Sequence, residues 1–189
     1  MTILAPSSAG ELRAMLELAL TLDGPTAIRY PKGAARQAGP GEVGAGLRAR
    51  RAREGLDVCI LAVGKLLGAA EDAALLLEEE GVTASVWDVR VVKPLDVVML
   101  AAAAAHPLVV TVEDGVVRGG VGSTIAAALR DTHGEEPGAQ PSLVTLGVPD
   151  AYIPHGHPDA ILAALGLDGT GIAASVRAAL RLRQVTARR

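Results

Sequence analysis

The chain has 189 residues, of which 50% are hydrophobic, and its 21 acidic and 18 basic side chains give a formal charge of −3. This composition is typical of a globular protein with one domain of ordinary size and some additional chain. The only basic concentration near the front, at 48–53, is short and interrupted by alanines, which favours a solvated segment over a binding patch. We therefore expect no nucleic-acid partner.

The first 33 residues predict a helix followed by a strand. Ser8 precedes apolar residues at helical spacing, and Glu11 stands three residues later, as in a capping box. The helix is expected to end near Gly24, and residues 25–30 form a short strand closed by proline and glycine. A piece of this size is too small to bury a core alone.

Residues 34–55 are rich in glycine and proline and lack an apolar period, which predicts a linker. Strands and helices then alternate. The predicted strands are 58–63, 83–89, 108–112 and 143–147, and the predicted helices are 66–80, 95–105, 122–130, 158–165 and 171–183. Strands of continuous Val, Ile and Leu between helices indicate an α/β domain with a largely parallel sheet buried on both faces. Ligands on such sheets gather at the carboxyl ends of the strands, here 64–65, 89–90, 113–114 and 147–148.

The strand and glycine-rich turn at 108–128 suggest a phosphate site, but the glycine spacing matches neither the dinucleotide fingerprint nor the P-loop. We favour glycines that allow close packing, and an anion at the helix start is the alternative. Glu113 and Asp114 are adjacent, so in a strand they should point to opposite faces and not act as a carboxylate pair. Ser123 stands where a helix N-cap would, and no Gly-x-Ser-x-Gly motif surrounds it.

The four histidines give no strong metal signal. His155 and His157 lie close to Asp159, but a surface turn explains this spacing and no third strong ligand is evident. His106 is expected to contact a backbone carbonyl at a helix end, and His133 to lie at an exposed helix end. We predict no metal site.

Cellular location follows from what the chain lacks. A single cysteine, Cys59, cannot form a disulfide within the chain, which fits a reducing compartment. No uncharged run reaches the roughly 18 residues of a membrane helix, and residues 1–10 lack the basic-then-apolar order of a signal peptide. We expect a cytoplasmic protein with no membrane partner.

The segment Arg29-Tyr-Pro-Lys-Gly33 is the best candidate for a binding site. It places two cations, Arg29 and Lys32, about a rigid proline turn, which suits an anionic group such as phosphate. An ordinary polar strand end would show the same pattern, so the residues alone leave both interpretations open.

Five segments in register resemble the 1-deoxy-D-xylulose 5-phosphate synthases, which are transketolase-like thiamine diphosphate enzymes. They are 29–33, 88–96, 110–114 with 119–123, and 147–156, followed by 165–172. The resemblance covers nearly the whole chain and places it at the carboxyl-terminal end of such an enzyme. It implies a tail of the pyrimidine-binding domain at 1–33, a linker at 34–55, and a transketolase C-terminal-like domain at 56–189. The implied sheet has about five strands, mostly parallel, with helices on both faces.

The resemblance implies that the full-length enzyme condenses pyruvate with glyceraldehyde 3-phosphate, with loss of CO2, in non-mevalonate isoprenoid biosynthesis. Thiamine diphosphate and Mg²⁺ would be its cofactors, and it would be a homodimer. The Gly-Asp-Gly motif that holds the diphosphate and magnesium has no counterpart here, nor has the glutamate that activates the cofactor. We therefore expect no catalytic, cofactor-binding or metal residue in this chain, no activity from it alone, and the amino-terminal domains of the same polypeptide as its partner.

The resemblance implies a binding role for one position of this chain. Lys32 occupies the place of the basic residue that holds the triose phosphate, where the family more often has arginine, and Arg29 is the neighbouring candidate. Lysine keeps the charge but loses the bidentate fork. The alternatives are a non-catalytic binding or assembly module, or the carboxyl-terminal part of a split transketolase or of a 2-oxoacid dehydrogenase beta subunit. Segments 30–33 and 147–156 favour the synthase.

Overall fold

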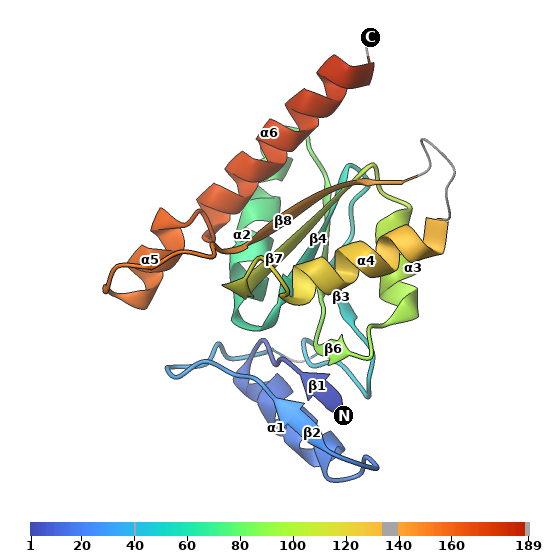
Figure 1. Cartoon of the computed structure of the whole chain (residues 1–189), viewed down its shortest axis with the longest axis vertical. Coiled ribbons are helices and arrows are strands. Elements are labelled where there is room, and N and C mark those ends of the chain that lie inside the picture. Colours follow the sequence, from blue (N-terminus) through green and yellow to red (C-terminus); the bar gives the residue numbers. More distant parts are fainter. Residues whose placement is uncertain (40, 134–139, 188–189) are drawn as a thin grey trace.

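The computed structural model describes residues 1–39, 41–133 and 140–187. Its main element is a five-stranded sheet of order β3-β5-β4-β7-β8 (Figure 1). The strands are β3 (Arg50–Arg53), β4 (Val58–Val63), β5 (Ala84–Asp88), β7 (Leu108–Val116) and β8 (Ser142–Val148). Only the edge strand β3 is antiparallel to its neighbour, and the other pairs are parallel. The predicted mostly parallel sheet of about five strands is confirmed.

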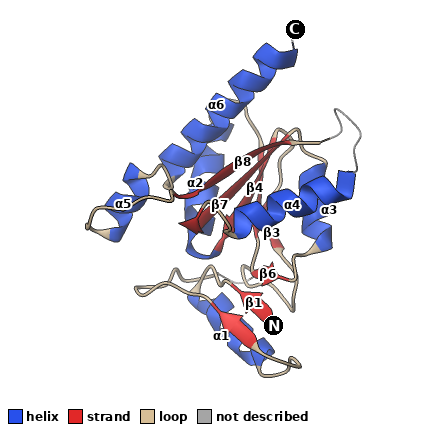
Figure 2. Cartoon of the chain, in the orientation of Figure 1, coloured by secondary structure: helices blue, strands red, loops and turns tan. Residues whose placement is uncertain are grey.

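Helices cover both faces of this sheet (Figure 2). One face packs against α2 (Leu67–Glu78) and α6 (Gly169–Ala187), and the other packs against α3 (Val97–Ala104) and α4 (Val121–His133). Successive residues of β4 alternate between the two cores, with Ile60 in the first and Leu61 in the second. Both sides of each central strand are therefore buried, which is why these strands read as continuous apolar runs.

A smaller sheet of order β2-β1-β6 lies beside the carboxyl end of the main one. It consists of β1 (Thr2–Leu4), β2 (Thr26–Ile28) and β6 (Val91–Lys93), with α1 (Ala9–Ala19) packed on it. The sequence predicts β2, which glycine and proline bound on both sides, but it predicts neither β1 nor β6. Since β6 follows β5 directly, the front of the chain is bound into the same body as the main sheet.

Residues 50–53, expected to be irregular linker, instead form β3. Arg51 pairs with Trp87 of β5, and its guanidinium lies 5.8 Å from the centre of the indole ring. The strand was missed because three of its four residues are arginine, whose aliphatic stems cover apolar surface while the charge stays in water. The division of the chain into domains at 33 and 55 stays a prediction.

The stretch Pro158–Val185 is long and apolar enough to cross a membrane by length and composition alone. In the structure it is two helices, α5 (Pro158–Ala164) and α6, separated at Gly166, which has a positive φ of 69°. Within this stretch α6 buries Ile172, Ala173 and Val176 in the core that it shares with α2.

Candidate functional site

The order of the strands marks one crevice of the main sheet. β4 comes first among the parallel strands, with β5 on one side and β7 on the other, so the direction of winding reverses between β4 and β7. In open α/β sheets ligands bind at the carboxyl ends of the strands beside such a switch point. Val63 pairs with Glu113 across this gap, so Lys65 and Asp114 meet at its carboxyl end.

A cavity of about 160 Å³ lies at this position, between the small sheet and the edge of the main one. Its lining residues are Ala5, Pro6, Arg29, Tyr30, Pro31, Val63, Gly64, Lys65 and Asp114. Two cationic side chains and one carboxylate therefore face the same small space.

Asp114 contacts both cations of the cavity. Lys65 Nζ lies 2.6 Å from Asp114 Oδ2, and both side chains are about one-third exposed. The Arg29 guanidinium donates to the backbone carbonyl oxygen of Asp114, 85 residues away in the sequence. The predicted residue Arg29 is thus tied to β7. Lys32 is exposed and follows Pro31, the last lining residue of that turn, so it does not line the cavity.

Glu113 turns away from the cavity, as expected for the neighbour of Asp114 in a strand. Its carboxylate is buried and accepts hydrogen bonds from the backbone N–H groups of Val121, at 3.1 Å, and Gly122, at 2.8 Å. These groups open α4, where an unpaired N–H and the helix dipole favour negative charge. The protein's own carboxylate therefore accepts from two N–H groups at this helix start, which favours the packing interpretation of the turn over an external anion.

The glycines of this turn allow close packing, as predicted. A Cβ on Gly120 would lie 2.2 Å from the carbonyl oxygen of Val116, and one on Gly122 would lie 2.5 Å from Thr111 Oγ1. Ser123 is not the N-cap, because α4 begins two residues earlier. Its hydroxyl donates to the carbonyl oxygen of Val117 at 2.6 Å and thereby braces the turn.

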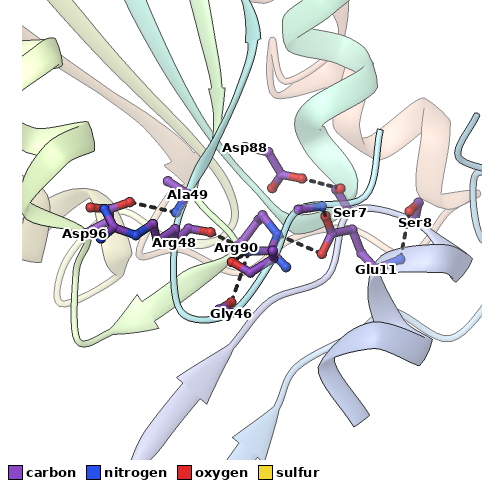
Figure 3. Close-up of polar contacts among 11 residues, drawn as sticks. Ser7, Ser8, Glu11, Gly46, Arg48, Ala49, Asp88, Arg90 and Asp96 are labelled. Carbon is purple, nitrogen blue, oxygen red and sulfur yellow. Dashed lines mark hydrogen bonds and ion pairs between the residues drawn. The ribbon is translucent and has the colours of Figure 1, made fainter. Parts of the chain in front are cut away.

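A buried polar cluster joins the small sheet to the main one (Figure 3). Arg90, with a positive φ of 55°, follows β5, and its Nε lies 2.7 Å from Oε2 of Glu11 on α1. Arg90 Nη1 also donates to the carbonyl oxygen of Gly46 at 3.2 Å and to that of Arg48. The other oxygen of Glu11 accepts from the N–H of Gly44 at 2.6 Å. One guanidinium and one carboxylate therefore fasten α1, the segment 44–48 and the end of β5 together.

Of the two hydrogen bonds that a capping box would form between Ser8 and Glu11, only one is present. Ser8 Oγ accepts from the Glu11 N–H at 3.1 Å, so the serine caps α1 as expected. The glutamate carboxylate does not reach back as in a capping box, because Arg90 and Gly44 hold it. The only sequence signal of this pair is an arginine directly after a buried strand.

Asp88 and Asp96 complete the cluster (Figure 3). Ser7 Oγ donates to Asp88 Oδ2 at 2.5 Å, while the fully buried Oδ1 has no hydrogen-bond partner among the described residues. Burial raises the pKa of Asp88 to about 7, against the opposing effect of the Ser7 hydrogen bond. Asp96 caps α3 by accepting from the Val98 N–H at 2.8 Å, and it also accepts from the N–H of Ala49 at 2.9 Å.

The remaining candidates for chemistry are separate from the cavity. His106 places its two ring nitrogens 2.9 and 3.0 Å from carbonyl oxygens, which confirms the expected helix-end contact. His157 lies 3.7 Å from Asp159 with both side chains exposed, and His155 is exposed as well. The side chain of His133 is outside the described residues. Within the described ranges, no three His, Cys, Asp or Glu side chains come together.

Comparison with known proteins agrees with this architecture. Residues 47–172 match the family described as "Transketolase, C-terminal domain". Two curated proteins named 1-deoxy-D-xylulose-5-phosphate synthase, from Magnetococcus marinus and Chlorobium luteolum, are 40% and 39% identical over 94% of this chain. The chain spans only 28% of the length of each.

Solved structures give the same result. One titled "Split gene transketolase, inactive beta4 tetramer" aligns with a TM-score of 0.82 and 32% identity, over 96% of this chain and 57% of that one. Transketolase from Campylobacter jejuni shares the fold, with a TM-score of 0.70 and 15% identity over 94% of this chain and 26% of that one. The family match, the strand order and these likenesses together show that the chain belongs to the transketolase C-terminal domain family.

Proposed function

We propose that this chain is the carboxyl-terminal portion of a 1-deoxy-D-xylulose 5-phosphate synthase, within an enzyme that condenses pyruvate with glyceraldehyde 3-phosphate and releases CO2. The observation that carries the proposal is the identity of about 40% over 94% of the chain to curated proteins of that name. The buried Glu11–Arg90 pair supports a structural role, because it fixes the front segment against the family domain.

The chain's own contribution to substrate binding is the turn after β2. Arg29 is held by β7 through the Asp114 carbonyl, which fixes the start of the turn, and Lys32, three residues later, is exposed. An exposed ammonium on a turn anchored at its base can contact a phosphate presented by another domain. We assign Lys32 to the triose phosphate and Arg29 to positioning the turn.

Thiamine diphosphate and Mg²⁺ do not fit the residues described. No three potential metal ligands gather in the ranges that the structure covers. The switch-point cavity, at about 160 Å³, is also smaller than the ~300–1,000 Å³ typical of pockets for organic ligands. We infer that the cofactor chemistry of the whole enzyme belongs to other parts of it, and that this chain contributes fold and substrate contacts.

A chimaera tests the proposal. The segment of the Magnetococcus marinus protein that aligns with this chain is replaced by residues 1–189, and product formation from pyruvate and glyceraldehyde 3-phosphate is measured. We expect an active chimaera. Lys32→Met should raise the KM for glyceraldehyde 3-phosphate at least tenfold and leave that for pyruvate unchanged, while Lys32→Arg should keep a low KM. Arg13→Met, on the exposed side of α1, is the matched control.

The outcomes separate the two parts of the proposal. A folded chimaera that binds thiamine diphosphate but forms no product would contradict the assignment to a synthase. An active chimaera in which Lys32→Met behaves like Arg13→Met would contradict only the phosphate role of Lys32.

A second candidate is a part of a split transketolase, favoured by the 32% identity to a structure with that title. The same chimaera distinguishes the two. Ketol transfer between sugar phosphates, without product from pyruvate, would identify this second function.

A further inference from the structure

We propose a second ligand site at the Lys65–Asp114 ion pair, for a small amphipathic anion: a short hydrocarbon chain that ends in a phosphate or carboxylate group. This site is independent of the synthase proposal, because Lys32 does not line it. It uses the switch point between β4 and β7, where the fold places ligands.

Two cavities share the residues of this ion pair in their linings. The first is the 160 Å³ cavity described above, on the side of the small sheet. The second, of about 210 Å³, is also lined by Lys65 and Asp114, and its other lining residues are Val148, Ile153, Pro158, Ile161, Leu162 and Leu165. Lys65 and Asp114 thus border both cavities, of which the first also contains the cation Arg29 and the second is otherwise lined by apolar residues.

The charges around the Lys65–Asp114 pair favour an anion. Lys65 and Arg29 face the space, and Asp114 supplies one carboxylate against these two cations. Glu113, the other acid of β7, is turned toward α4 and bound by its backbone N–H groups. Lys65 also lies in the 3₁₀ turn Gly64–Leu66 that leads into α2, where the first backbone N–H groups add positive potential. Its ammonium has three donors, so an incoming anion can share it with Asp114.

The ion pair is open to exchange. The Lys65 side chain is 30% exposed and that of Asp114 is 37% exposed, so water already screens their attraction. This differs from the Glu11–Arg90 pair, which is almost completely buried. The Lys65–Asp114 pair can therefore open for a ligand without leaving a charge buried.

The apolar lining of the second cavity favours a hydrocarbon group. Ile161 and Leu162 of α5 and Leu165, directly after it, line this cavity. Leu162 and Leu165 are only partly buried against the first core, and no residue of α5 is fully buried. A hydrocarbon chain placed there would remove these side chains from water, a gain proportional to the apolar area covered. The anionic end of the same molecule would then reach Lys65 and Arg29 across the ion pair.

Calorimetry on the full chain tests the site with butyl phosphate as the probe. Inorganic phosphate, butanol and pentanoate are titrated separately, so that the contributions of the charge, the chain and the kind of acid are distinguished. We expect butyl phosphate to bind at least tenfold more tightly than inorganic phosphate or butanol. The comparison with pentanoate decides between phosphate and carboxylate as the preferred group.

Two variants probe the two halves of the site. Lys65→Met should weaken butyl phosphate at least tenfold, and Ile161→Gln should reduce its affinity to that of inorganic phosphate. Leu75→Gln, at an exposed position of α2, is the control, and circular dichroism verifies that each variant is folded. Equal affinities for butyl phosphate and inorganic phosphate, or no effect of Lys65→Met, would overturn the proposal. Absence of binding together with self-association in sedimentation would overturn it in favour of a second copy on this face.

Discussion

Glu11 and Arg90 are 79 residues apart in the sequence, yet their side chains form a 2.7 Å ion pair that is at most 1% exposed. Each partner also bonds the backbone of the segment 44–48. The pair therefore connects α1, this segment and the end of β5, and it holds the small sheet against the carboxyl edge of the main one.

Removing the glutamate should be costly. Glu11→Ala leaves the Arg90 guanidinium buried without its counter-charge, and such a change costs about 3–5 kcal/mol of the free energy of unfolding. Urea denaturation measures this. Glu54→Ala is the control, because Glu54 pairs with Arg51 at 3.2 Å on an exposed surface, where a pair is worth about 0–1 kcal/mol. Similar losses of unfolding free energy in the two variants would show that the buried pair does not hold the small sheet against the main one.

Asp88 should make stability fall between mildly acidic and alkaline pH. Burial raises its pKa in the folded protein from 3.8 to about 7, so the folded state binds the proton more strongly. The resulting stabilisation is complete below the unfolded pKa and is lost as pH rises through about 7. Asp88→Asn should therefore flatten the decrease in Tm between pH 5.5 and 8, since the amide carbonyl still accepts from Ser7.

Asp57 provides a control of opposite sign. Hydrogen bonds from the side chain and backbone of Thr83 lower its pKa, so its stabilisation is present above its unfolded pKa and lost in acid. Asp57→Asn should change the Tm profile below pH 4 and leave the region near pH 7 unaltered. An Asp88→Asn profile parallel to the parent's from pH 5.5 to 8 would contradict the raised pKa.

Replacing each of two glycines by alanine should change the stability of the protein in opposite directions. In Gly120→Ala the new Cβ would meet the Val116 carbonyl oxygen at 2.2 Å and the Glu113 carboxylate at 2.5 Å, so the start of α4 must shift. We expect a loss of about 2 kcal/mol or more, as for other overpacked sites. Gly68 lies in α2, where a new methyl group would have no atom within 4 Å, so Gly68→Ala should stabilise by up to about 1 kcal/mol. Thermal denaturation gives the Tm of both variants. Equal Tm values for Gly120→Ala and Gly68→Ala would contradict the close packing described at Gly120.

Thiamine diphosphate with Mg²⁺ should not bind to this chain alone. Among the described residues no cluster of metal ligands forms, and the switch-point cavity of about 160 Å³ is smaller than typical pockets for organic ligands. Isothermal titration calorimetry should give no heat of binding, with the active chimaera as the positive control. A micromolar Kd for the isolated chain would refute this prediction.

The central strands and their helices could be predicted from the sequence, because burial on both faces imposes long apolar runs on β4, β5 and β7. The short strands β1 and β6 and the arginine-rich β3 could not, since their pairing partners lie far away in the chain. Likewise the cations at Arg29 and Lys65 are visible in the sequence, but their common contact with Asp114 depends on the register of β7 against β4.

The sequence by itself determined the fold class, the family resemblance and the approximate positions of the central strands, although β7 extends four residues beyond the predicted 108–112. Tertiary structure decided what the charged residues near the ends of those strands do. Glu113 and Asp114 are neighbours in the chain, yet one is held by the first N–H groups of α4 and the other by Lys65. Glu11 has the spacing of a capping residue but binds Arg90. The reason is physical: apolar periodicity is local, whereas the partner of a charge is set by the distant segments that folding brings within hydrogen-bond distance.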